Sequence, residues 1–215
     1  MRSRFALLLL AGITGVAGCG LFARPHSTPQ TTPTDPDLDW KLEPFSLTER
    51  SGRTVTDKDL RGSVWVASFI FTRCNGPCPA VSSTVGKLQA DFKDEPGVKF
   101  VTFTVDPKRD DLAALKDYAN ARGADPERWL FLTGDEATIH ELIAKQFKQG
   151  VGRNDLPNAK PGEEFIHSSK LMVVDRNGVI RGMYEGLPND RSLDPKGDFD
   201  ANLDRLKARV KELLK

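Results

Sequence analysis

The segment Val64–Ala80, VWVASFIFTRCNGPCPA, decides how this chain folds. Its first part, Val64–Phe71, is rich in β-branched and aromatic residues, which predicts a buried central strand. Apolar residues then recur at helical spacing over residues 81–92, which predicts a helix. Cys74 and Cys78 lie in the loop that joins the two, at the carboxyl end of the predicted strand.

Further strands and helices alternate along the rest of the chain. In order, the sequence predicts a hairpin over 45–55, a buried strand over 98–105, a helix over 110–120, a strand over 128–133, a helix over 133–147 with a capping box of Thr133 and Glu136, a hairpin over 170–186 turned by Asn177-Gly178, and a helix from Phe199. Right-handed crossovers between such elements predict a three-layer α/β domain with a central mixed sheet, an N-terminal β-hairpin and a C-terminal helix. This arrangement matches a thioredoxin-like fold, in which the loop after the first central strand carries the chemistry.

Composition and charge indicate a globular protein without a broad electrostatic field. The chain has 215 residues, of which 39% are hydrophobic and 28% charged, and this is enough to bury a core. Its 31 basic and 30 acidic side chains leave a formal net charge of +1. A field that would attract nucleic acid is therefore missing, and we expect no nucleic-acid partner.

The N-terminus is typical of an exported lipoprotein. Residues 1–18 carry two arginines, Arg2 and Arg4, before a short apolar run, which predicts a signal peptide. The motif Val16–Cys19, VAGC, resembles a lipobox, so Cys19 is the predicted lipid anchor; an ordinary signal peptide with an incidental cysteine is the alternative. Residues 19–39 then form a Pro/Thr-rich linker, and residues 40–215 form the folded domain, facing the periplasm or the outer side of the cytoplasmic membrane.

The cysteine pair is suited to either redox exchange or metal binding. Pro79 fits the first turn of a helix, which would make Cys78 roughly the N-cap and bring both sulfurs to the positive helix end. We therefore expect both thiol pKa values to lie below the ordinary value of about 8.5. Three residues, Asn75–Pro77, separate the cysteines, and this wider loop could hold an ion between them or allow a Cys74–Cys78 disulfide.

Two thiolates form an incomplete site for most metals, and the histidines are the candidates for a third ligand. His26 lies in the linker and is predicted to be solvated, whereas His140 is expected to be an ordinary helix residue. His167 precedes an apolar strand predicted to lie beside the first central strand, and it follows an irregular segment, 151–165, of the kind that often forms a mobile functional loop. His167 is thus the candidate ligand, with an ordinary hydrogen-bonded histidine as the alternative. Two thiolates and one imidazole would favour Cu(I) over zinc or an iron–sulfur cluster.

Four motifs in this order resemble the Sco/SenC family of thioredoxin-fold copper carriers, which assist assembly of the CuA centre of cytochrome c oxidase. The motifs are FIFTRCNGPCP at 69–79, TVDPKRD at 104–110, LTG at 132–134, and His167 followed by LMVVDRNG. The chain departs from the family pattern at Ile166, where an acidic residue is frequent, and at Asp111, where threonine is frequent.

The resemblance implies that Cys74, Cys78 and His167 bind copper, as Cu(I) and with Cu(II) as a further option. It also implies a copper chaperone that delivers the ion to cytochrome c oxidase subunit II or another copper-acceptor protein. The alternative is a thiol-disulfide oxidoreductase that reduces the acceptor's cysteines, in which Cys74 attacks and Cys78 resolves. A structural disulfide in a protein-binding lipoprotein and a peroxidase are further alternatives.

The segment around Asp106 has two interpretations. Asp106, Pro107 and Arg109 are expected to form a capped strand-to-helix turn, in which Asp110 or Asp111 complements the helix dipole. Alternatively, their charged side chains line a rim on which a partner docks.

Overall fold

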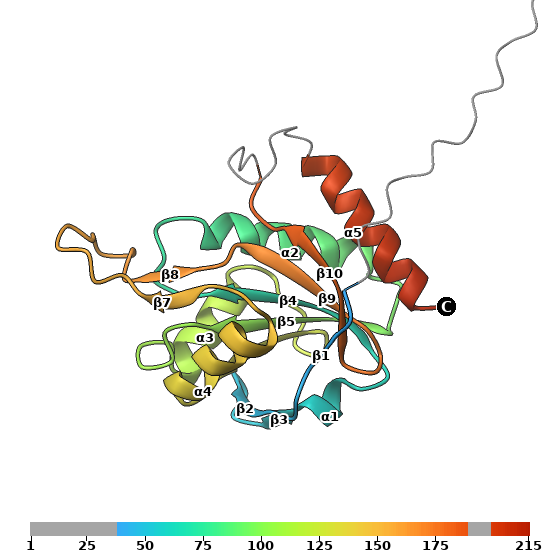
Figure 1. The fold of residues 1–215 in the computed structure, drawn as a ribbon, viewed down its shortest axis with the longest axis horizontal. Coiled ribbons are helices and arrows are strands. Elements are labelled where there is room, and N and C mark those ends of the chain that lie inside the picture. The colour runs from blue at the N-terminus through green and yellow to red at the C-terminus, as the bar shows by residue number, and fades with distance from the viewer. Residues whose placement is uncertain (1–37, 189–198) are drawn as a thin grey trace, which may run out of the picture. The chain divides into compact units, whose positions relative to one another are not determined.

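A mixed sheet of eight strands runs through the centre of the described part of the chain (Figure 1). The structure is a computed structural model, and it describes residues 38–188 and 199–215. The predicted signal peptide, Cys19 and His26 lie outside these residues. In spatial order the strands are β1 (Trp40–Lys41), β10 (Val179–Glu185), β9 (Lys170–Val174), β4 (Val64–Ile70), β5 (Val98–Thr104), β6 (Trp129–Thr133), β2 (Ser46–Glu49) and β3 (Thr54–Thr56).

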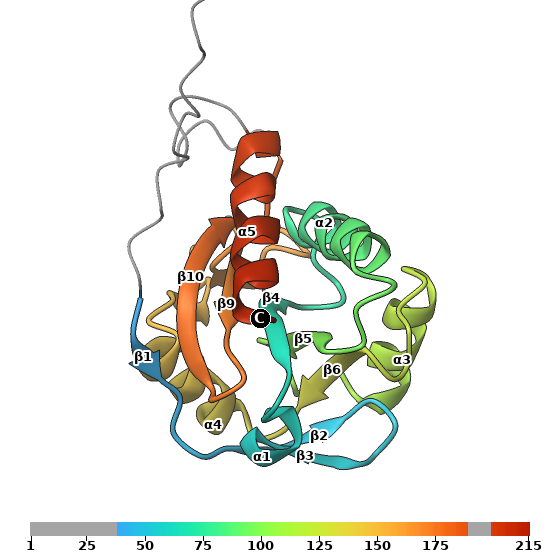
Figure 2. The same cartoon turned by 90° about the vertical axis from the view of Figure 1, so that its right-hand side faces the viewer.

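Helices cover both faces of this sheet. They are α1 (Asp57–Leu60), α2 (Cys78–Asp91), α3 (Leu112–Asn120), α4 (Glu136–Glu141), which continues into the π-helical turn η1 (Leu142–Gln146), and α5 (Phe199–Leu213). Figures 1 and 2 show α2 and α5 on one face and α4 on the other. Helix α3 lies on the same face as α2, because Tyr118 Oη and Ser82 Oγ are hydrogen-bonded at 2.9 Å. The predicted three-layer α/β architecture is confirmed.

The central strand β4 is buried along its whole length, as its apolar sequence predicts. It pairs in parallel with β5, from Val64 opposite Val98 to Ile70 opposite Thr104, and β5 pairs in parallel with β6. On its other side β4 pairs antiparallel with β9. The strand that follows His167 therefore lies beside β4, and this brings the histidine to the carboxyl end of that strand.

Aromatic side chains fill the layer between the sheet and the α4 segment. The ring of Phe147, which follows η1, lies 5.2 Å from that of Phe69 and 5.5 Å from that of Phe103. Trp65 packs against the same Phe147 ring at 6.2 Å. All four side chains are buried, so this layer supports β4 and β5, the two strands whose carboxyl ends lead to the site.

The turn between β9 and β10 forms as Asn177-Gly178 predicts. Gly178 has a φ of +72°, a conformation that glycine adopts without strain. The carboxylate of Asp175 accepts hydrogen bonds from the backbone N–H groups of Asn177 and Val179, at 2.8 and 2.9 Å. The hairpin prediction is confirmed.

The predicted capping box of Thr133 and Glu136 is wrong. Thr133 is the last residue of β6, and it pairs there with Thr48 of β2. Asp135 caps α4 instead, because its carboxylate accepts a 2.9 Å hydrogen bond from the backbone N–H of Thr138. The carboxylate of Glu136 is bound by Lys108 and Arg153 and does not reach back to the chain before the helix.

Residues 151–165 are not irregular throughout, which corrects the sequence prediction. Strands β7 (Val151–Arg153) and β8 (Phe165–His167) form a separate two-stranded antiparallel sheet, in which His167 lies opposite Val151. Only the connecting residues, 154–164, form a loop. Among the described residues, no helix is both long and apolar enough to cross a membrane.

Candidate metal centre

Three side chains meet at the carboxyl end of β4. Cys74 lies on the loop after the strand, Cys78 is the first residue of α2, and His167 is the last residue of β8. Their ligand atoms all lie within 4.8 Å of one another, and Cys78 Sγ is 3.1 Å from His167 Nε2. The structure thus brings together the three residues that the sequence singled out. The two farthest apart in the sequence, Cys74 and His167, are separated by 93 positions.

The cysteine loop is shaped by its own short-range contacts. The backbone N–H of Cys74 donates to the carbonyl of Phe71 at 3.2 Å, which closes a turn directly after β4. Pro77 is the N-cap of α2, so Cys78 and Pro79 occupy the first turn. The sequence prediction of Cys78 as the N-cap is therefore wrong by one position.

The two thiols differ in acidity, which corrects the expectation that both would be acidic. A hydrogen bond from the Cys78 thiol lowers the pKa of Cys74 to about 4 despite burial, with smaller contributions from His167 and the backbone N–H of Gly76. The Gly76 nitrogen lies 3.4 Å from Cys74 Sγ. Burial raises the pKa of Cys78, whose side chain is fully enclosed, and the neighbouring Cys74 raises this pKa further. One thiolate and one thiol therefore coexist at neutral pH.

The imidazole of His167 is oriented as a metal ligand would be. Its Nδ1 lies 3.0 Å from the backbone carbonyl oxygen of Ser168. Since a carbonyl oxygen can only accept, Nδ1 carries a hydrogen, and Nε2 is the ring nitrogen that faces Cys78 Sγ. The Phe71 ring meets the imidazole edge-on, with ring centroids 5.7 Å apart. The Ser168 carbonyl takes the orienting role that a neighbouring side chain often has, while Ile166 points outward with 61% of its surface exposed.

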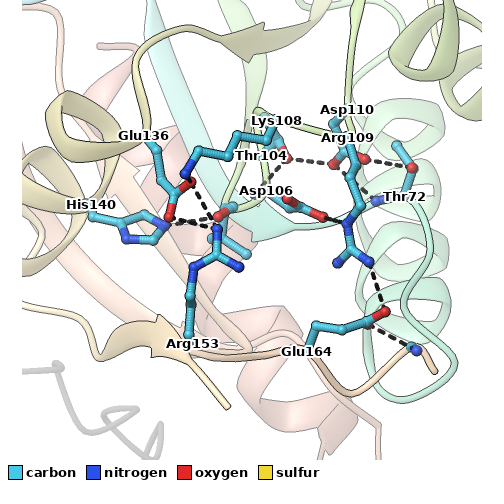
Figure 3. A network of polar contacts seen from close by, with 12 residues as sticks. Thr72, Thr104, Asp106, Lys108, Arg109, Asp110, Glu136, His140, Arg153 and Glu164 are labelled. Atoms are coloured by element: carbon cyan, nitrogen blue, oxygen red, sulfur yellow. Dashed lines mark hydrogen bonds and ion pairs between the residues drawn. The ribbon is translucent and has the colours of Figure 1, made fainter. Parts of the chain in front are cut away.

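A buried carboxylate fixes the start of the cysteine loop. Asp110 accepts hydrogen bonds from the backbone N–H of Thr72, at 3.0 Å, and from its hydroxyl, at 2.6 Å (Figure 3). It also accepts one from the hydroxyl of Thr104, at the end of β5. Burial raises the pKa of Asp110, and the hydrogen bonds from Thr104 and Thr72 oppose that shift. The sequence predicts only a helix-end role for Asp110, because its partners Thr72 and Thr104 lie on other elements.

The turn after β5 has the expected local structure. Its backbone closes by hydrogen bonds from the N–H groups of Arg109 and Asp110 to the carbonyl of Asp106. Asp111 then caps α3, because its carboxylate accepts a 2.8 Å hydrogen bond from the N–H of Ala114. Arg109 makes ion pairs with Asp106 and with Glu164 (Figure 3). A partner-docking role for this segment stays a prediction.

The remaining described histidine does not join the cluster. His140 Nε2 lies 2.8 Å from the carbonyl oxygen of Val105, and its ring packs against Phe165. Within residues 38–188 and 199–215, the Cys74, Cys78 and His167 group is the single cluster of three or more potential metal-ligating side chains. Two sulfurs and one imidazole nitrogen suit a soft ion of low coordination number.

Comparisons with known proteins agree with this geometry. A sequence model of the family described as SCO1/SenC matches residues 35–196. The SCO1 protein homolog of Bacillus subtilis is 34% identical over 154 residues, which cover 71% of this chain and 77% of that protein.

Two solved structures are also similar to this chain. One is BsSco, described as a member of the Sco family of cytochrome c oxidase assembly proteins with a disulfide switch; it has 30% identity and a TM-score of 0.64, over 81% of this chain and 96% of that one. The other is yeast Sco1 with copper bound, with 26% identity and a TM-score of 0.57, over 80% of this chain and 90% of that one.

Proposed function

This chain belongs to the SCO1/SenC family, and from that premise we propose that it carries one copper ion on Cys74, Cys78 and His167. It would deliver the ion to cytochrome c oxidase subunit II, or to another copper acceptor, during assembly of the oxidase. The observation that carries this proposal is the convergence of two sulfurs and Nε2 within 4.8 Å. Copper in yeast Sco1 and the oxidase-assembly role named for the Sco family give further support.

The donor set favours copper over other common ions. Cu(I) is soft and accepts three ligands, so two thiolates and a neutral imidazole satisfy it. Zinc would require a fourth ligand, and the described residues offer no fourth cysteine, histidine or carboxylate in the cluster. Copper binding to Cys78 displaces its proton, because metals bind thiolates and not thiols. Cys74 needs no such step, since it is ionised above pH about 4.

A carrier must also release its ion. A three-coordinate ion leaves room for an incoming ligand, so copper can pass to the acceptor by stepwise exchange without becoming free. The site lies on loops and element ends, and His167 is partly exposed, which supports access by an acceptor's cysteine or histidine side chains.

An anaerobic Cu(I) titration tests the carrier proposal. The full chain with Cys19→Ser has only Cys74 and Cys78 as thiols, because the sequence contains three cysteines. We expect the reduced protein to bind one Cu(I) per chain in competition with a Cu(I) chelator. After oxidation to a Cys74–Cys78 disulfide we expect no binding, since the ligands are thiolates. Tight binding by the oxidised protein would contradict the proposal.

We also propose that Cys19 is lipidated and that the domain is held at a membrane on its outer side. The VAGC motif after a short apolar segment supports this, together with the Pro/Thr-rich linker that follows. Mass spectrometry of protein extracted from the membrane fraction is expected to find a lipid adduct on Cys19. Cys19→Ser should abolish the adduct and shift the protein out of that fraction. An unmodified Cys19 in membrane-bound protein would reject this mode of anchoring.

A second candidate function, thiol-disulfide reduction, is favoured by the unequal thiols. The Cys74 thiolate would attack one sulfur of an acceptor disulfide, forming a mixed disulfide and releasing the other acceptor sulfur as a thiolate. Cys78 would then lose its proton and attack Cys74, which completes the reduction of the acceptor and leaves a Cys74–Cys78 disulfide. A dithiol reductant would have to regenerate the pair. The low pKa of Cys74 and the enclosure of Cys78 suit these attacking and resolving roles.

A further inference from the structure

We propose that Asn75, Gly162 and Glu164 form a clamp that positions His167 beside the two sulfurs. We call this set the loop clamp. It joins the cysteine loop to residues 154–164, the loop from which β8 and His167 emerge. The inference rests on the proposed copper-carrier function, because it assigns the clamp a part in copper affinity. Asn75, Gly162 and Glu164 are positioning residues and do not belong to the Cys74, Cys78 and His167 donor set.

Asn75 connects the two loops with both its backbone and its side chain. Its backbone N–H donates to the carbonyl of Gly162 at 3.3 Å, and its Nδ2 donates to the carbonyl of Pro161 at 2.9 Å. One residue between the cysteines thus holds two consecutive carbonyl groups from a segment 86 residues later. Two hydrogen bonds from one residue restrict both the distance and the direction of the second loop relative to Cys74.

Gly162 allows this close approach. Its φ is +91°, which side chains other than glycine rarely adopt. A Cβ atom at this position would lie 2.5 Å from Asn75 Nδ2 and 2.8 Å from Asn75 Cβ. The contact between the loops therefore depends on the absence of a side chain at residue 162.

Glu164 fixes the same loop from a second direction. One carboxylate oxygen accepts a 2.8 Å hydrogen bond from the backbone N–H of Gly162, and the other accepts a 2.7 Å hydrogen bond from Arg109 Nη1. Arg109 is itself paired with the buried Asp106, just after β5 (Figure 3). The loop is thereby joined to the sheet as well as to the cysteine loop.

The hairpin that carries His167 needs this support. Strands β7 and β8 have three residues each and belong to a sheet of only two strands. A short two-stranded hairpin is marginally stable by itself. Glu164 directly precedes β8, and His167 follows three residues later, so a contact that fixes residues 161–164 also restricts where the imidazole can lie. Phe165, the first residue of β8, packs on Phe71, so an apolar contact holds the start of this strand in addition to the loop clamp.

The test measures the Cu(I) affinity of the full chain after Asn75→Ala and, separately, Glu164→Ala. Asn75 is exposed, so its replacement should leave the fold intact. We expect each variant to weaken Cu(I) binding by about tenfold. This is the lower end of the affinity loss seen when a residue that orients a metal ligand is removed. Asn158→Ala is the matched control, because Asn158 is an exposed asparagine of the same loop for which the described residues contain no hydrogen-bond partner.

A double-mutant comparison separates positioning from a general structural effect. If the clamp acts through the imidazole, Asn75→Ala should cause no further loss of affinity in a His167→Ala background. A full additional loss in that background would overturn the proposal, because the clamp would then act on the sulfurs. Unchanged affinity in both single variants would also overturn it.

A copper-free readout keeps the two proposals distinguishable. In the reduced protein without metal, the ¹⁵N and ¹H NMR signals of the His167 ring should move toward those of a solvent-exposed histidine in Asn75→Ala and stay unchanged in Asn158→Ala. If the parent chain bound no Cu(I), the carrier function would fail, and these ring signals alone would decide the clamp. Unmoved ring signals would then reject it.

Discussion

His167→Ala is expected to weaken Cu(I) binding by more than about 100-fold. This is a larger loss than is typical when a residue that only hydrogen-bonds to a metal ligand is removed. The same variant should exchange disulfides with a small dithiol at close to the parent rate. The reason is that Nε2 is one of three donor atoms for the ion, whereas attack on a disulfide needs only the two sulfurs. Cu(I) competition titrations and thiol-disulfide exchange rates on the same preparations measure the two effects.

Replacement of a sulfur should affect both activities. Cys78→Ser removes a soft ligand and the resolving thiol together, so Cu(I) binding and completed disulfide exchange are both expected to fall by at least about 100-fold. His26→Ala removes a histidine from the linker and serves as the control for non-specific copper binding. If His167→Ala kept its full Cu(I) affinity, the carrier proposal would lose its third ligand, and the reductase alternative would become the better account of the site.

Alkylation of Cys74 by iodoacetamide is expected to be nearly independent of pH between 5.5 and 7.5. The folded pKa of about 4 lies below this window, so the thiolate population is already complete at its acidic end. An ordinary thiol, with a pKa of about 8.5, would gain roughly 100-fold in thiolate over the same two pH units. Because the pKa of Cys74 is lowered, its alkylation rate should fall only as the pH drops through about 4. Rates from mass spectrometry of the Cys19→Ser chain give the profile.

Two controls identify the cause of that profile. Cys78→Ala removes the hydrogen bond that contributes most to the low pKa of Cys74, so reactivity should begin to rise with pH within the measured window. The urea-unfolded chain should show the steep rise of an ordinary thiol. A folded parent protein whose alkylation rate climbs steadily to pH 7.5 would rule out a stable Cys74 thiolate.

The fold could largely be predicted because its main signals are local. The continuous apolar run of β4, the helical spacing after Pro79 and the Asn177-Gly178 turn are each read from a few neighbouring residues. The capping error arose at an element boundary, where Thr133 is needed for the ladder with β2 and Asp135 takes the cap. Strands of three residues, such as β7 and β8, are too short to establish a period-two pattern.

The site could be predicted only in part, since much of its chemistry depends on distant contacts. Residue type and the position of His167 before a strand that lies beside β4 made it a candidate ligand, and the resemblance to the Sco/SenC family implied the full set of copper ligands. The raised pKa of Cys78 could not be predicted from the sequence, because it depends on complete burial under elements far apart in the sequence. Asn75 looked like a mere spacer between the cysteines, and its partner Pro161 lies 86 residues away.

The enclosure of Cys78 imposes a direction on metal exchange. Cys78 has no exposed surface, whereas Cys74 is 8% exposed as a residue and His167 is more exposed still. An incoming nucleophile can therefore reach the ion only from the flank of Cys74 and His167. Loading and unloading of copper would therefore both take place on this side of the site.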